Sequence, residues 1–204
     1  MRTRFALLAL LVVPALTAAG CAGDPITDRA GAAPASTAGA AAPTTAVPTT
    51  AAPETTRPAP RSLIPVAHRK PAPDLQVTAF DGRTITMARL RGRPVVVNFF
   101  ESWCVVCRAE QDTVDAVAHK FRGRVQFVGV SNYDTVSEGR KYQRDYQIPY
   151  PLANDRSGRT WAAWGVPYQP VTVVVDQRGW VAWRFVGGLE AGQLDPVLEY
   201  LVEA

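Results

Sequence analysis

The stretch that decides the fold is Val95-Val96-Val97-Asn98-Phe99-Phe100-Glu101-Ser102-Trp103-Cys104-Val105-Val106-Cys107-Arg108-Ala109-Glu110. Its first part is an apolar run typical of a buried strand, and the part after Trp103 is typical of a helix. Two cysteines, three residues apart, stand at the junction. Unpaired backbone N–H groups and the helix dipole favour a thiolate there. The stretch therefore indicates a dithiol that opens and closes as a disulfide at a helix N-terminus.

Hydrophobic periodicity and turn residues predict the elements on either side. Asp81-Gly82 is a hairpin signal after an alternating segment. We expect strands at 75–80, 95–100, 125–130, 150–153, 171–175 and 180–185, and helices from 104 to about 121 and at 135–146, 157–164 and 189–202. A β-α-β opening followed by a β-turn-β unit and a terminal helix predicts a three-layer α/β domain with a mixed central sheet.

The two cysteines have different expected roles. Cys104 opens the helix, so we expect it to be the attacking thiol. Cys107 lies one turn further in and should be more buried, which makes it the resolving thiol. Trp103 should pack beside the exposed sulfur and form part of a docking surface. A metal site is not expected, because two cysteines without a nearby His or third Cys supply half a zinc site.

Glu110 is the unusual residue of the helix. At 100° per residue it shares an apolar face with residues that should point at the sheet, namely Val106, Thr113, Val114, Val117 and Phe121. Burial there would raise the pKa of its carboxyl group. A bend that lets Glu110 reach solvent, or a hydrogen bond to a backbone group, would explain it without a function. Because it also lies one turn beyond Cys107, we expect it to exchange a proton with that thiol.

Residues 1–21 have the pattern of a lipoprotein-type signal peptide. Arg2 and Arg4 precede an apolar run at 5–16, which is too short to span a bilayer, and small residues lead to Cys21. We expect lipidation of Cys21 and a membrane lipid anchor, with plain secretion after cleavage nearby as the alternative. Residues 22–70 are rich in Ala, Pro and Thr and are expected to form a disordered tether. The folded domain is then expected at 71–204.

Composition sets further limits on function. The chain has 204 residues, of which 47% are hydrophobic and 20% charged, with a net charge of +4. This suits one globular domain with additional segments. The Lys and Arg residues are scattered, and no basic patch is interleaved with aromatic residues, so nucleic-acid binding is not expected.

Residues 97–110 resemble the active-site segment of thioredoxin-fold proteins. The resemblance is strongest to the TlpA/ResA/DsbE-like group of exported, membrane-tethered thiol–disulfide oxidoreductases in the redoxin (AhpC/TSA) superfamily. Similar runs occur at Phe127–Ser131, Asp155–Gly158, Trp164–Val166 and Val173–Gly179. The resemblance implies a thioredoxin fold with an N-terminal β-hairpin extension and a central insertion at 132–159.

The resemblance also implies roles outside the cysteine segment. Pro170 matches the cis-proline before the third core strand, although a trans strand-entry proline is the more common state. The backbone of Gln169 would pair with an incoming substrate segment. One departure from the group is Val105-Val106 between the cysteines, where a pair containing proline is common. This pair offers no charge to stabilise a thiolate, which argues against a strongly oxidising site.

The expected activity is thiol–disulfide exchange with protein substrates outside the cytoplasmic membrane, without a cofactor. As a reductant, the protein would keep substrate thiols reduced, for example the haem-binding cysteines of apocytochrome c in cytochrome c maturation or those of a copper-site assembly protein. It would then need electrons from a membrane partner of the CcdA/DsbD type. As an oxidant, it would form disulfides in exported proteins. Two alternatives are a thiol-dependent peroxidase of the redoxin superfamily and a non-enzymatic lipoprotein with a structural disulfide.

Overall fold

The structure is a computed structural model and describes residues 59–204. The signal peptide, Cys21 and the tether as far as residue 58 lie outside the described residues. At the centre is the strand β3 (Val95–Phe99), whose five residues are all buried. It runs parallel to β4 (Gln126–Ser131) and antiparallel to β6 (Val171–Val175). The expected mixed sheet is confirmed.

The sheet has seven strands in the order β2-β1-β5-β4-β3-β6-β7. Its other strands are β1 (Gln76–Ala79), β2 (Thr84–Thr86), β5 (Leu152–Asn154) and β7 (Val181–Val186). The helices are η1 (Val66–His68, a 3₁₀ turn), α1 (Met87–Leu90), α2 (Val105–Lys120), α3 (Val136–Asp145), α4 (Arg159–Ala163) and α5 (Asp195–Glu203).

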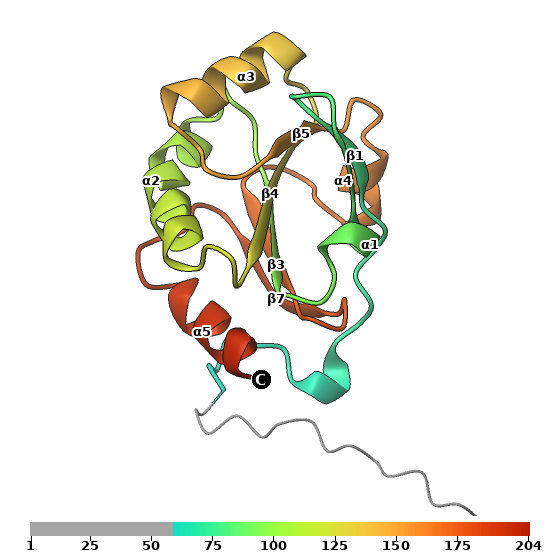
Figure 1. The fold of residues 1–204 in the computed structure, drawn as a ribbon, viewed down its shortest axis with the longest axis vertical. Helices are drawn as coiled ribbons and strands as arrows, with labels where there is room; N and C mark the ends of the chain where they lie inside the picture. The colour runs from blue at the N-terminus through green and yellow to red at the C-terminus, as the bar shows by residue number, and fades with distance from the viewer. Residues whose placement is uncertain (1–58) are drawn as a thin grey trace, which may run out of the picture. The chain divides into compact units, whose positions relative to one another are not determined.

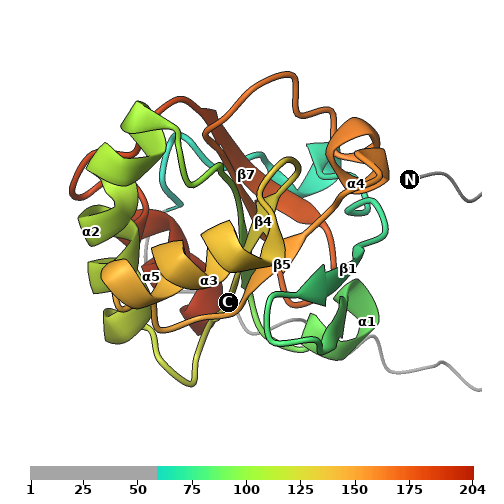
Figure 2. The same ribbon diagram turned by 90° about the horizontal axis from the view of Figure 1, so that it is seen from above.

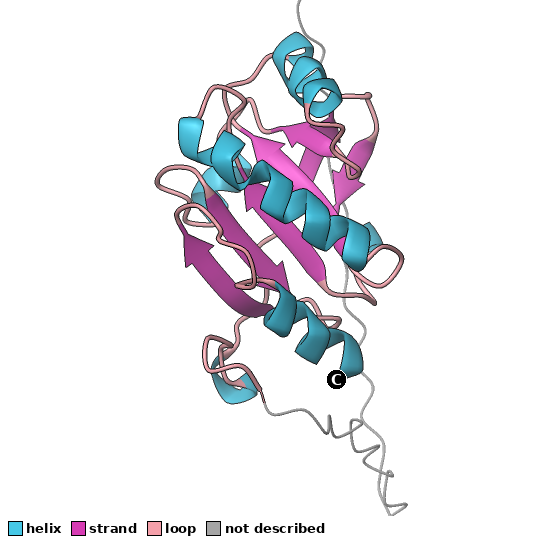
Figure 3. Cartoon of the chain, turned by 90° about the vertical axis from the view of Figure 1, so that its left-hand side faces the viewer, coloured by secondary structure: helices cyan, strands magenta, loops and turns pink. Residues whose placement is uncertain are grey.

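Helices cover both faces of the sheet and make three layers. The helices α2, α3 and α5 lie on one face, and α1 and α4 lie on the other (Figures 1 and 3). The alternation of β3 matches this, because Val96 joins the core under α2 and α5 while Val95 and Val97 join the core under α4. This is the predicted three-layer thioredoxin-type arrangement.

The hairpin and the insertion extend the sheet at one side. The strands β1 and β2 pair around the Asp81-Gly82 turn, as expected. The insertion contributes α3 and then β5, which pairs with β4 on one side and with β1 on the other. Figure 2 shows α3 lying across this part of the domain, near β5. The insertion therefore joins the N-terminal hairpin to the central sheet.

Packed residues begin earlier than the expected boundary at residue 71. Leu63 is buried, and the backbone N–H of Ile64 donates to the carbonyl of Ala182 at 2.9 Å. The N–H of Val181 donates to the carbonyl of Lys70 at 2.8 Å. These contacts satisfy backbone groups along β7, which is an edge strand. Residues 63–70 thus cover the edge of the sheet.

The last helix begins later than its apolar pattern predicts. We expected a helix from Leu189, but α5 begins at Asp195, with Pro196 in its first turn. The N–H of Leu189 donates to Glu110 Oε2. The expectation was wrong because residues 189–194 form a loop with a backbone contact to α2, which periodicity does not reveal.

Candidate active site

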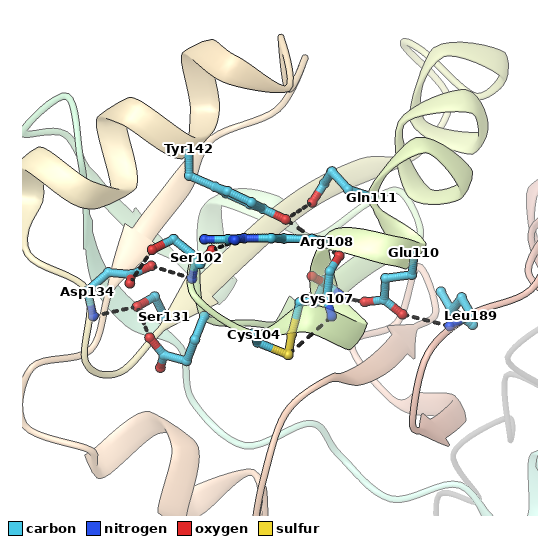
Figure 4. The surroundings of a disulfide bond; sticks show 12 residues. Ser102, Cys104, Cys107, Arg108, Glu110, Gln111, Ser131, Asp134, Tyr142 and Leu189 are labelled. Atoms are coloured by element: carbon cyan, nitrogen blue, oxygen red, sulfur yellow. Dashed lines mark hydrogen bonds between the residues drawn. A yellow bond between two sulfur atoms is a disulfide. The ribbon is translucent and has the colours of Figure 1, made fainter.

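The two cysteines lie where β3 gives way to α2, and they form a disulfide with Cα atoms 5.2 Å apart. The carbonyl of Glu101 accepts from the N–H of Cys104 at 3.0 Å and closes the turn after the strand. Cys104 is the N-cap of α2, and its Sγ accepts from the N–H of Cys107 at 3.1 Å (Figure 4). After reduction the same N–H would face the Cys104 thiolate, so the geometry stabilises negative charge on that sulfur.

Burial distinguishes the two cysteine residues as expected. Cys104 keeps 8% of its surface exposed, against 1% for Cys107. Trp103, directly before Cys104, is 54% exposed. An attacking substrate therefore has better access to Cys104 than to Cys107.

Glu110 lies on the buried face of α2, as the sequence predicts, with 3% of its surface exposed. Its Oε1 accepts from Asn98 Nδ2 at 3.0 Å. Its Oε2 accepts from the N–H of Leu189 at 2.6 Å, as Figure 4 shows. Burial raises the pKa of Glu110, and these two hydrogen bonds oppose the rise. The backbone bond to Leu189 gives the side chain a structural role as well, which is one of the explanations that the sequence left open.

The buried face of α2 differs from the predicted one in its first turn. Val106 was expected to face the sheet, but 48% of its surface is exposed. The buried residues of α2 are Cys107, Glu110, Gln111, Val114, Val117 and Ala118. Their alternating spacing of three and four starts at Cys107. The stripe thus begins with the second cysteine, and Val106 lies outside it.

The structure brings Pro170 to the same end of the sheet as the disulfide. The Gln169–Pro170 peptide bond is cis, as the resemblance implied. Pro170 directly precedes β6, whose first residue, Val171, pairs with Phe99 at the end of β3. Gln169 is half-buried.

Glu101 and Asp134 are two site residues that sequence reasoning missed. Glu101 is fully buried and accepts from the N–H groups of Asn132 at 2.7 Å and Tyr133 at 3.1 Å, and from Ser131 Oγ at 2.8 Å. Burial raises the pKa of Glu101, and the charge of Asp134 adds to the rise. The available signal was an acidic residue placed directly after an apolar strand.

Asp134 faces the same turn from the loop after β4. It is 1% exposed, and its carboxylate accepts from Ser102 N at 3.0 Å and from Ser102 Oγ at 2.7 Å (Figure 4). The active-site turn is therefore attached to the loop after β4 through two buried carboxylates.

A separate cluster of polar side chains connects α2 to α3. Tyr142 OH donates to Gln111 Oε1 at 3.0 Å (Figure 4). Gln111 Nε2 donates to Asp115 Oδ1 at 2.8 Å and to Tyr150 OH at 2.9 Å. Burial raises the pKa of Asp115 to about 6. These side chains join α2 to α3 and to the approach to β5.

A groove of about 560 Å³ opens between the active-site turn and α3. Its walls come from the active-site turn and from α2 and α3, with the lining residues Ser102, Trp103, Arg108, Glu138, Lys141, Tyr142, Asp145 and Tyr146. Its lining is mixed aromatic and charged and includes Trp103, which directly precedes Cys104, while neither cysteine lines it.

Within residues 59–204 no three His, Cys, Asp or Glu side chains gather in a way that could hold a metal ion. Over the same residues, none of the helices has the length and apolar character needed to cross a bilayer.

Comparison with protein families matches residues 68–184 to the AhpC/TSA family. This match spans more than half of the chain. It runs from the segment that covers β7 to β7 itself, so it contains the complete cysteine turn and Pro170.

Individual relatives are similar over the same region. The thiol:disulfide interchange protein DsbE of Pseudomonas fluorescens biotype C is 30% identical over 123 residues, which cover 59% of this chain and 67% of the relative. The thiol-disulfide oxidoreductase ResA of Bacillus cereus is 24% identical over 131 residues, covering 64% and 76%. Among solved structures, a secreted Mycobacterium tuberculosis disulfide oxidoreductase homologous to E. coli DsbE has a TM-score of 0.55 at 26% identity, with 64% of this chain and 96% of that chain covered.

Proposed function

Since this chain belongs to the AhpC/TSA family and is a thiol–disulfide oxidoreductase, we propose that it exchanges disulfides with other proteins through a mixed disulfide on Cys104. The observation that carries this is the N-cap position of Cys104, where its sulfur accepts the Cys107 N–H. Trp103, Gln169 and Pro170 would form the docking surface around that sulfur.

The proposed reduction of a substrate disulfide has two steps. The Cys104 thiolate attacks one substrate sulfur, a mixed disulfide forms, and the other substrate sulfur leaves as a thiolate. Cys107 then loses its proton to Glu110 and attacks Cys104 Sγ. The Cys104–Cys107 disulfide forms and the second substrate sulfur leaves. Two electrons pass to the substrate, and the reverse sequence would oxidise a substrate dithiol.

The reductant direction is the one we propose for the cell. Val105-Val106 supplies no charge that would stabilise the Cys104 thiolate strongly, and a strong oxidant needs that stabilisation. Electrons would come from a membrane partner of the CcdA/DsbD type. Disulfides between the haem-binding cysteines of apocytochrome c would be one substrate class, in cytochrome c maturation. Equilibration with glutathione tests this: a potential more negative than ~−180 mV agrees, and one near ~−120 mV contradicts it.

We propose that the protein works outside the cytoplasm, anchored by a lipid on Cys21. The sequence of residues 1–21 and the secreted relative support export. Labelling of cells with a radioactive fatty acid tests the anchor. Label on the wild-type chain and none on Cys21→Ser agrees with it, whereas an unlabelled wild type in the culture medium indicates plain secretion.

A substrate competition separates this function from a thiol peroxidase. The reduced protein is mixed with a peptide disulfide or with hydrogen peroxide at equal concentration, and loss of its thiols is followed over time. We expect the peptide disulfide to oxidise the protein faster. Rapid, Cys104-dependent turnover of peroxide with a slow peptide reaction would contradict the proposal.

A further inference from the structure

The turn that presents Cys104 is held from outside the strand–helix unit that forms it. Ser102 donates its N–H and its Oγ–H to the carboxylate of Asp134, at 3.0 and 2.7 Å. Its carbonyl accepts from Arg108 Nε at 2.6 Å. All the backbone and side-chain polar groups of Ser102 are therefore engaged, one residue before Trp103 and two before Cys104.

The loop after β4 is held in return by Glu101. The Glu101 carboxylate accepts from Asn132 N, Tyr133 N and Ser131 Oγ, at 2.7, 3.1 and 2.8 Å. Ser131 links the two acids, because its Oγ also accepts from Asp134 N at 3.0 Å. The turn and the loop are thus joined in both directions, with an acid from each side bonded to the other.

Burying the two carboxylates costs free energy, and packing alone does not require them. Glu101 is 0% and Asp134 1% exposed. Within residues 59–204 neither acid takes part in a salt bridge. Two unpaired buried carboxylates are unfavourable unless hydrogen bonds compensate for lost hydration. Here every hydrogen bond that the two carboxylates accept runs between residues 101–102 and residues 131–134.

The main-chain bond from Cys104 completes the connection to the sulfur. The N–H of Cys104 donates to the carbonyl of Glu101 at 3.0 Å. Because Glu101 is fixed by its side chain, its carbonyl fixes the backbone from which Cys104 projects. From these contacts we infer that Glu101 is a positioning residue for Cys104, acting together with Ser131 and Asp134. The inference rests on the proposed role of Cys104 as the attacking thiol.

Positioning of this kind affects the reaction more than binding. A sulfur displaced from the line of attack reacts slowly even when the substrate docks, and small displacements are costly in rate. A displaced Cys104 would also lose its hydrogen bond from the Cys107 N–H, which would raise the pKa of the Cys104 thiol. Both effects are measurable, and the second needs no protein substrate.

The test uses the full chain with Glu101→Ala, Glu101→Gln and Ser131→Ala. Glutamine keeps an acceptor for the loop N–H groups, whereas alanine leaves them unpaired. Ser131→Ala removes one oxygen and with it the link between the two acids. This smaller change tests the same role if Glu101→Ala does not fold. The matched control is Asp176→Asn, because Asp176 is a buried turn carboxylate next to Val175, which pairs with Val95 at the opposite end of β3.

Two quantities are measured for each reduced variant. One is the pH dependence of Cys104 alkylation by iodoacetamide, with the adduct located by peptide mass spectrometry. The other is turnover of a peptide disulfide with dithiothreitol as the electron donor, with kcat and KM determined separately. For Glu101→Ala we expect kcat to fall by ~10-fold or more with KM within ~3-fold, and the Cys104 pKa to rise. Ser131→Ala should lower kcat and raise the Cys104 pKa by smaller amounts. The kcat of Glu101→Gln should stay within ~3-fold of the wild-type value.

The outcomes separate the two proposals. If Glu101→Ala and Ser131→Ala lose only thermal stability, as Asp176→Asn should, and keep the wild-type alkylation profile and kcat, the positioning role is wrong. If the wild type does not turn over the peptide disulfide at all, the proposed function fails. The alkylation profiles then still decide whether Glu101 positions the sulfur.

Discussion

Asn98 Nδ2 donates a hydrogen bond to Glu110 Oε1 at 3.0 Å, joining the central strand to the helix that carries both cysteines. The same nitrogen donates to Thr172 Oγ1 on β6 at 3.0 Å. Both residues of the pair are buried. The hydrogen bond from the Asn98 amide therefore lowers the pKa of a carboxylate whose pKa burial raises, in the first two turns of α2.

Glu110→Gln tests whether this carboxylate moves a proton. We expect the fold to persist, because a glutamine can still accept from the Leu189 N–H, and the release of the second substrate thiol to slow by ~100-fold at pH 7. Rapid acid quenching and mass spectrometry measure that release. Glu190→Gln, at an exposed neighbouring carboxylate, should have no effect. Equal rates for Glu110→Gln and the wild type from pH 5 to 9 would remove Glu110 from the mechanism.

Asn98→Ala tests the support that Glu110 receives. Loss of the amide N–H removes a bond that lowers the pKa of Glu110, so that pKa should rise further. Glu110 then ionises at higher pH. In a plot of the release rate of the second substrate thiol against pH, the rise should therefore shift to higher pH by ~1 unit. Thr172→Val is the control, because it leaves the Asn98–Glu110 bond in place. A limb that does not move in Asn98→Ala would show that Glu110 does not govern it.

Asp115→Asn should alter the pH dependence of stability. The pKa of Asp115 is raised to about 6 in the folded protein by burial. The stability that a carboxyl group with a raised pKa contributes is fully present below its unfolded pKa of ~4. That contribution is lost as the pH rises through the pKa of the group in the folded protein. The variant should therefore be more stable than the wild type at pH 7, by ~1 kcal/mol after discounting for partial exposure, and no more stable at pH 4. Urea titrations at both pH values measure the difference, and the same difference at both would contradict the assignment.

Gln147→Gly should stabilise the end of α3. Gln147 follows the helix with φ 54°, a left-handed conformation that costs a residue with a side chain ~1 kcal/mol. We expect a gain of ~0.5–1 kcal/mol in the free energy of unfolding. Gly123→Ala, at φ 79° after α2, is the reverse test and should lose ~1 kcal/mol. A loss of stability in Gln147→Gly would mean that the side chain makes a contact worth more than the strain.

Much of the fold could be predicted because the apolar residues of each segment repeat with the period of a strand or with that of a helix. The apolar run that begins at Val95 indicated a buried strand, and the cysteines after it marked the start of a helix. The start of α5 was not predictable, because Leu189 is apolar and fits the helical pattern while its N–H bonds to Glu110, seventy-nine residues away in the chain. Periodicity records which residues are apolar and carries no information on such long-range backbone contacts.

The same limit applies to the site. Cys104, Cys107 and Glu110 lie within one segment, so their helical spacing predicted their relative positions. Glu101 also lies in that segment, but its partners come from the end of β4 and the loop after it, thirty or more residues later. Spacing in the sequence gives no register between separate strands, and the contact between Glu101 and Ser131 exists because β3 and β4 pair in parallel.

In the proposed mechanism Cys104 attacks and Cys107 resolves, and trapping of the mixed disulfide distinguishes these two roles. Cys107→Ser and Cys104→Ser are each reduced and mixed with a peptide disulfide, and the products are identified by mass spectrometry. Cys107→Ser should accumulate a stable mixed disulfide on Cys104, since the resolving thiol is absent, while Cys104→Ser should form little adduct. A stable adduct on Cys107 in Cys104→Ser, with none on Cys104 in Cys107→Ser, would contradict the account.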